Sequence, residues 1–148
     1  MKVLIENRQK TTKISQQEIK RDSAVLLRLL GLKDAELSLL LVDDRRMRRL
    51  NYKYRGIDRT TDVLSFPQQE LPATFNFMLG DVVINLQATK RQAPEHGLSF
   101  NEELRWLLVH GVLHLIGYDH EKSKYAERKM RAMERELLAH LPCLVKKG

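Results

Sequence analysis

Hydrophobic residues along the chain fall into two kinds of pattern. Two short apolar runs, residues 2–6 (KVLIE) and 37–42 (LSLLLV), are typical of buried strands. Two more strands are expected at 62–67 (DVLSFP), which a proline stops, and at 80–86 (GDVVINL), which is rich in β-branched residues. Residues 68–78 follow neither period and are expected to form a loop.

In other segments apolar residues recur every three or four positions, which is the period of an amphipathic helix. The first such helix is expected to begin at Ser15, which can form a capping box with Glu18, and to end at Gly31. The second follows the aspartate pair at 43–44 and closes at Gly56.

Three further helices are expected in the second half of the chain. One covers 87–96, and the next begins at Ser99, which can form a capping box with Glu102. The last covers 121–139 and turns a stripe of alanine, methionine and leucine inward. Strands interspersed with helices predict an α/β or α+β fold, in which helices are layered on a sheet, and the length predicts a single domain over 1–148.

The charge balance indicates a polyanionic partner. The 26 Lys and Arg residues exceed the 19 Asp and Glu residues, and the formal net charge is +7. Such an excess favours nucleic acid above other partners, because basic patches attract phosphates without sequence information. The candidates for phosphate contact lie on the second helix and are Arg45, Arg46, Arg49 and Lys53. The alternative is that these residues only form a solvent-exposed helix face.

The cysteine count and the lengths of the apolar runs indicate the cellular location of the protein. The chain has a single cysteine, Cys143, so it cannot form an internal disulfide, which fits a reducing cytosol. The first ten residues hold only three apolar residues in a row, too few for the core of a signal peptide. No apolar run approaches the length of a membrane span. We therefore expect a cytoplasmic protein without a membrane partner.

Three of the five histidines fall in one stretch, HGVLHLIGYDH at 110–120. His110 and His114 are four residues apart and would share one face of a helix. Gly117 can end that helix in a left-handed conformation and let His120 reach the same ion. Three imidazoles predict a tripod at the end of a central helix, for one zinc ion per chain, with nickel, copper or cobalt as alternatives. The fourth position, open to water, is typical of a catalytic site.

Gly111 distinguishes this stretch from a related metal-binding signature. The spacing matches the long zinc-protease signature, in which a glutamate after the first histidine is the general base. That position is Gly111 here, so a metallopeptidase would need its base from elsewhere. Phosphodiester cleavage suits the site better, because its main demand is to stabilise charge on phosphoryl oxygens. A binding factor with structural zinc is a third possibility, and His96 and His140 are expected to be surface or cap residues.

Metal-binding histidines commonly donate their second N–H to a carboxylate or a carbonyl. Asp62 and Asp81, beside expected strands, and Asp119, next to the third histidine, are the acidic residues considered for this role. We favour an ordinary structural role for each of them, since neighbours in sequence often point apart.

The stretch HGVLHLIGYDH resembles the histidine signature of the YbeY-type bacterial endoribonucleases, also called rRNA maturation factors. NYKYRGIDRTTDVLSFP at 51–67 and LGDVVIN at 79–85 resemble two further signatures of that family. The resemblance implies a small mixed sheet of about four strands with about five helices packed around it. It implies that the three clustered histidines bind zinc, and Arg55 matches the arginine that the family uses near the metal.

The same resemblance implies metal-dependent hydrolysis of single-stranded RNA. It places the activity in ribosomal RNA maturation, notably at the 3′ end of the small-subunit RNA, and in ribosome quality control, with RNA and the ribosome as partners and no DNA. The chemistry of Arg55 agrees, because a guanidinium offers paired donors to phosphate oxygens and cannot act as a base at neutral pH. Attack by water and attack by the neighbouring 2′-hydroxyl, with the metal as Lewis acid, both stay open.

Overall fold

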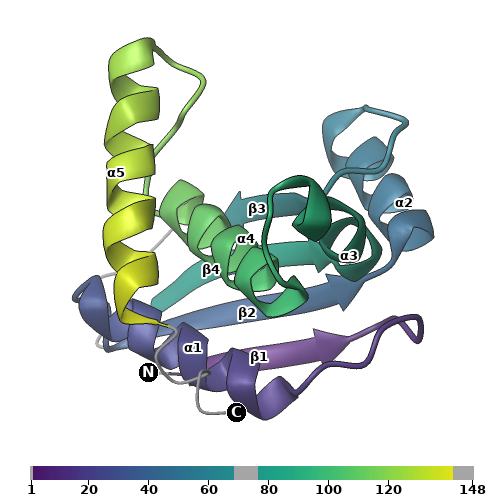
Figure 1. Cartoon of the computed structure of the whole chain (residues 1–148), viewed down its shortest axis with the longest axis horizontal. Helices are drawn as coiled ribbons and strands as arrows, with labels where there is room; N and C mark the ends of the chain where they lie inside the picture. The colour runs from purple at the N-terminus through teal and green to yellow at the C-terminus, as the bar shows by residue number, and fades with distance from the viewer. Residues whose placement is uncertain (1, 69–76, 142–148) are drawn as a thin grey trace.

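Four strands form one sheet in the computed structural model, which describes residues 2–68 and 77–141 (Figure 1). The strands are β1 (Lys2–Asn7), β2 (Ala35–Val42), β3 (Val63–Pro67) and β4 (Phe77–Asn85). The helices of the described residues are α1 (Gln16–Leu29), α2 (Asp44–Arg55), α3 (Leu86–Glu95), α4 (Phe100–Leu115) and α5 (Lys124–His140). The predicted α/β class, with four strands and five helices, is confirmed.

The sheet is mixed, and its order is β1-β2-β4-β3. β1, β2 and β4 are parallel neighbours, whereas β3 pairs with β4 in the antiparallel direction. Parallel neighbours need a crossover connection, and α1 supplies it between β1 and β2. β4 begins at Phe77, earlier than the predicted residue 80. The remainder of the expected loop, residues 69–76, lies outside the described residues.

Alternation along the strands gives the sheet two hydrophobic faces. Leu37, Leu39 and Leu41 of β2 are fully buried in the main core, to which α1, α4 and α5 also contribute. Val42 belongs to a smaller cluster, where it packs with Met47 of α2. Since successive side chains of a strand point to opposite faces, helices cover both sides of the sheet.

The polar residues that were expected to start and end helices do so. Ser15 caps α1 and accepts from the backbone N–H of Glu18 at 3.2 Å, but the return bond from the Glu18 side chain that the predicted capping box requires is absent among the described residues. Asp43 caps α2, and Gly56 ends it in a left-handed conformation with φ 71°. Ser99 and Glu102 form both hydrogen bonds of the predicted capping box at the start of α4.

Two features of α5 differ from the prediction. The helix begins at Lys124 and not at 121, because the Ser123 side chain caps it. Its inner face holds the expected Met130 and Leu137, but it also buries Glu134, which is 5% exposed. The predicted apolar stripe therefore contains a carboxyl group.

Candidate active site

The last turn of α4 ends in a hydrogen-bonded reversal of the chain. Gly117 has φ 105° and donates its N–H to the carbonyl of His114 at 3.1 Å. Tyr118 donates to the carbonyl of Leu113 at 3.0 Å, which completes a Schellman motif. The motif turns the chain back over the end of α4 and brings His120 beside the helix, as the sequence predicted for Gly117.

The three histidines form a cluster. The ring centroid of His110 lies 4.8 Å from that of His114 and 5.1 Å from that of His120, and the third separation is 5.3 Å. One ligand nitrogen from each ring lies within 4.8 Å of the others. Among residues 2–68 and 77–141, no fourth His, Cys, Asp or Glu joins this group. The cluster has the form of a tripod with an open side.

The local environment of these imidazoles fits a metal ion. The Nδ1 atom of His120 is buried and has no hydrogen-bond partner among the described residues. A buried unpaired nitrogen costs free energy unless something binds it. Burial lowers the pKa of His114 below its ordinary 6.5, and the neighbouring His110 and His120 act in the same direction. A lower pKa keeps the ring neutral at neutral pH, which is the form that binds metals.

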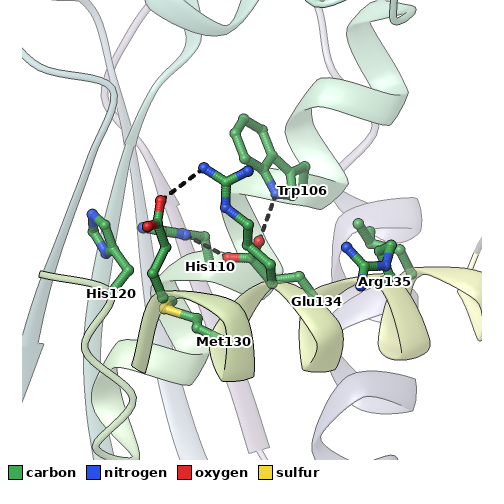
Figure 2. Close-up of a pocket in the computed structure, with 9 residues that line it drawn as sticks. Trp106, His110, His120, Met130, Glu134 and Arg135 are labelled. Carbon is green, nitrogen blue, oxygen red and sulfur yellow. Dashed lines mark hydrogen bonds and ion pairs between the residues drawn. The ribbon is translucent and has the colours of Figure 1, made fainter. Parts of the chain in front are cut away.

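His110 is held from behind by a buried carboxylate, a contact that Figure 2 shows in full. Glu134 of α5 lies 2.6 Å from His110 Nδ1 through its Oε2 atom. The indole N–H of Trp106, one turn before His110 on α4, donates to Glu134 Oε1 at 3.1 Å. Both oxygens of one carboxylate therefore contact side chains of α4.

The histidines line a cleft of about 660 Å³, here called the histidine cleft. Arg55, the last residue of α2, lines the same cleft, so the structure brings the predicted arginine and the three histidines together. Asp62 and Glu121 also line this space. The cleft therefore brings together three imidazoles that could hold a metal ion, one guanidinium and two acidic residues.

The remaining predicted phosphate contacts lie elsewhere on α2. Arg45, Arg49 and Lys53 are exposed, and Arg46 is half-buried. None of the four belongs to the lining of the histidine cleft. They add positive charge to the helix that carries Arg55, at positions outside the histidine cleft.

Gly111 lies at a close contact between α4 and the sheet. A Cβ atom placed there would lie 2.6 Å from Val82 Cγ1 and 3.3 Å from Val63 Cγ2. Its carbonyl accepts a hydrogen bond from Ser65 Oγ at 2.8 Å. The position faces β3 and β4 and leaves no room for a side chain. The glutamate of the zinc-protease signature therefore does not fit at this position.

A Gly111→Ala substitution is expected to lower the free energy of unfolding by about 1–3 kcal/mol, because the added methyl group overpacks the contact with Val82. Alanine is otherwise the better helix former by about 1 kcal/mol, so the packing effect must exceed that gain. Urea unfolding measures the difference. Ala132→Gly on the exposed face of α5 measures the helix-propensity part separately. A Gly111→Ala protein as stable as the parent would contradict the close contact.

Comparison with known proteins identifies the family. The sequence profile of the family described as Endoribonuclease YbeY matches residues 4–142. The chain belongs to the YbeY endoribonuclease family. YbeY proteins of Aquifex aeolicus and Geobacter metallireducens are both 44% identical to it, over 132 and 144 residues. These alignments cover 89% and 95% of this chain, and 87% and 96% of the two relatives.

A solved structure shows the same fold. The solution structure of a Thermotoga maritima protein superposes with a TM-score of 0.62 at 26% identity, and the match covers 99% of this chain and 95% of that one. The family assignment made from the three motifs is confirmed, and with it the hydrolase class, since YbeY proteins are endoribonucleases. No helix among the described residues is long and apolar enough to cross a bilayer.

Within residues 2–68 and 77–141, the acidic residues considered from the sequence make no hydrogen bond to the three clustered histidines. Asp62 accepts from the N–H of Val63 at 2.8 Å, and Asp119 accepts from the N–H of Glu121 at 3.0 Å. These are the ordinary structural roles that were favoured for both. Asp81 lies within β4, opposite Phe66 of β3.

Among the described residues, the carboxylate within hydrogen-bond distance of a clustered histidine is that of Glu134, which sequence reasoning missed. The sequence contained a sign of this role. Glu134 lies at helical spacing from Met130 and Leu137, which places a charged residue on an apolar helix face. Trp106 was also missed, although it precedes His110 by one turn and so lies on the same face of α4.

The two histidines outside the cluster have structural contacts. His96 is the C-cap of α3, as predicted, and its Nδ1 lies 2.8 Å from the buried carboxyl group of Glu103. This hydrogen bond raises the pKa of His96 above its ordinary value. His140 contacts the backbone carbonyl of Glu136 at 3.0 Å. Neither histidine belongs to the group that could hold a metal ion.

Proposed function

We propose that this member of the YbeY family is an endoribonuclease that uses one zinc ion per chain to cleave single-stranded RNA. The observation that supports it most is the histidine cleft, whose lining combines three imidazoles with the guanidinium of Arg55. Three neutral nitrogen ligands suit zinc, and His110, His114 and His120 would hold it. When bound, zinc supplies Lewis acidity toward a phosphoryl oxygen.

Within this proposal Arg55 is the catalytic residue that binds the scissile phosphate. Its guanidinium can donate two parallel hydrogen bonds to phosphate oxygens and stabilise the charge that grows there as the P–O bond breaks. The proton of the attacking hydroxyl needs an acceptor, and Asp62 and Glu121 place two carboxylates in the same cleft. The cleft therefore offers a base that does not depend on position 111.

The biological role that fits this activity is maturation of ribosomal RNA in the cytoplasm, notably at the 3′ end of the small-subunit RNA, together with ribosome quality control. The relatives in Aquifex aeolicus and Geobacter metallireducens carry the name endoribonuclease. The net charge of +7 supports association with RNA and the ribosome.

RNA affinity is expected to fall steeply with salt, because each neutralised phosphate of a single strand contributes a slope of about −0.7 in log K against log salt. Replacing Arg45 and Arg49 together with alanine should reduce the magnitude of this slope by roughly 1.4, if both contact phosphates. Fluorescence anisotropy with a labelled single strand measures it. The control is the double variant Arg28→Ala, Lys33→Ala, which removes the same charge from another exposed region. If it changes the salt slope equally, α2 is not part of a specific RNA-binding surface.

Two alternatives were considered from the sequence. A metallopeptidase is disfavoured, because Gly111 packs against β3 and β4 and its position cannot hold the glutamate base. A binding factor with structural zinc would need a closed coordination shell. Within the described ranges the tripod has no fourth protein ligand, which favours a catalytic role.

Metal content and activity, measured on the same preparation, test the proposal. We expect about one zinc per chain, cleavage of single-stranded RNA, loss of cleavage after chelation and recovery on adding zinc. Analysis of the product ends separates the two modes of attack, since a 2′-hydroxyl nucleophile leaves a cyclic phosphate or its hydrolysed form. Full cleavage by protein freed of metal would overturn the proposal.

A further inference from the structure

The buried carboxylate behind His110 has no role in the function proposed so far. Glu134 is 5% exposed, on the inner face of α5 between Met130 and Leu137. A buried ionised carboxylate costs several kcal/mol unless it is paired and hydrogen-bonded. A leucine or methionine there would continue the apolar stripe without that cost. The presence of a carboxyl group on this face therefore needs an explanation.

Both oxygens of Glu134 contact α4, which Figure 2 makes visible as two dashed lines from Trp106 and His110 that meet at the carboxylate. The indole N–H of Trp106 can only donate, so Glu134 Oε1 accepts that bond. The bond orients the carboxylate and leaves Oε2 for His110 Nδ1 at 2.6 Å. The cavity between α4 and α5, about 420 Å³, is lined by all three residues.

The direction of the second hydrogen bond determines the tautomer of His110. An ionised carboxylate only accepts, so His110 must carry its proton on Nδ1. A neutral imidazole with Nδ1–H has its lone pair on Nε2, which is then the nitrogen available for a metal. We propose that Glu134 is a positioning residue of the metal centre, which acts through His110 by fixing its ring and tautomer and thereby strengthens zinc binding.

Charge supports the same assignment. Imidazoles bind metals in their neutral form, so a bound dication would keep its full charge. The exposed Glu121 carboxylate lies 3.8 Å from His120 Nε2, beyond hydrogen-bond distance, whereas the buried Glu134 carboxylate is hydrogen-bonded to His110. Such a carboxylate orients a ligating histidine and raises its basicity, and its loss typically weakens metal binding by 10–100-fold. This inference rests on the proposed zinc site.

A purely structural role would be to join α5 to α4 through two hydrogen bonds. Glu134→Gln separates the two roles. Glutamine keeps the shape and can still accept from Trp106, but it presents an N–H₂ donor to His110 Nδ1. His110 must then accept a hydrogen bond at Nδ1 and carry its proton on Nε2. That proton occupies the lone pair that Nε2 needs to bind zinc. The substitution therefore changes the tautomer of His110 while it preserves the packing.

The experiment is a zinc competition titration with a chromophoric chelator on the full chain. We expect Glu134→Gln to bind zinc about 10–100-fold more weakly than the parent. Glu127→Gln is the matched control, because it removes a carboxylate from the same cavity without a contact to His110, and it should leave the affinity unchanged. Nitrogen-15 NMR of the zinc-loaded parent should show the His110 proton on Nδ1, a readout that requires no variant.

The outcomes of the titration and the NMR experiment are distinct. If the parent binds zinc and Glu134→Gln binds it equally well, the positioning role fails while the proposed function stands. A His110 proton on Nε2 in the zinc-loaded parent overturns the role independently, even if the variant does not fold. If the parent itself takes up no zinc, the proposed function and this inference fail together.

Discussion

Replacing His114 with alanine is expected to abolish RNA cleavage, with a loss of at least about 10³-fold. His114 forms one corner of the histidine triangle, with the other two ring centroids 4.8 Å and 5.3 Å away, so its removal leaves only two imidazoles to hold the ion. Two imidazoles bind zinc much more weakly than three. The measurements are zinc content after dialysis and the rate of cleavage of a labelled single-stranded RNA at saturating enzyme.

His140→Ala is the matched control, since it removes a histidine from α5 outside the proposed metal site. It should retain both zinc and activity. Adding zinc in excess should restore part of the His114→Ala activity only if the two remaining imidazoles still place the ion correctly. A folded His114→Ala protein that cleaves RNA at the rate of the parent would remove the tripod from the mechanism.

Replacing Arg55 with alanine is expected to reduce kcat for RNA cleavage by roughly 10²–10³-fold, which is the usual effect of removing one donor to a developing oxyanion. Zinc affinity should not change, because Arg55 reaches the cleft from α2 while the ligands come from α4 and the turn after it. Single-turnover cleavage and zinc titration measure the two quantities. Lysine at this position should rescue only in part, because it lacks the planar pair of donors.

Arg28→Ala on α1 removes the same charge from an exposed position and controls for the loss of general attraction to RNA. It should lower affinity slightly and leave kcat unchanged. If Arg55→Ala and His114→Ala both fold and bind RNA, yet cleave it as the parent does, the catalytic assignment is wrong. The protein would then act as an RNA-binding factor.

Local patterns in the sequence determined most of the secondary structure and the histidine cluster. Ser15, Asp43 and Ser99 cap helices because their side chains contact backbone groups only a few residues away. His110 and His114 share a face because four residues make about one helical turn. Gly117 brings in His120 through a turn that closes within six residues. All these interactions are short-range, so residue type and spacing are sufficient to predict them.

Tertiary packing alone decided the rest of the site. Arg55 joins the histidines only because α2 and α4 border one cleft, and no local signal distinguished it from the other arginines of α2 without the family resemblance. Glu134 contacts His110 across 24 residues of chain, because α5 packs on α4. The sequence has glycine at position 111, where the zinc-protease signature has glutamate. Only the packing of Val82 and Val63 against this position shows why a side chain does not fit there. Contacts between elements depend on how the helices pack on the sheet. The spacing of residue types along the chain does not specify that packing.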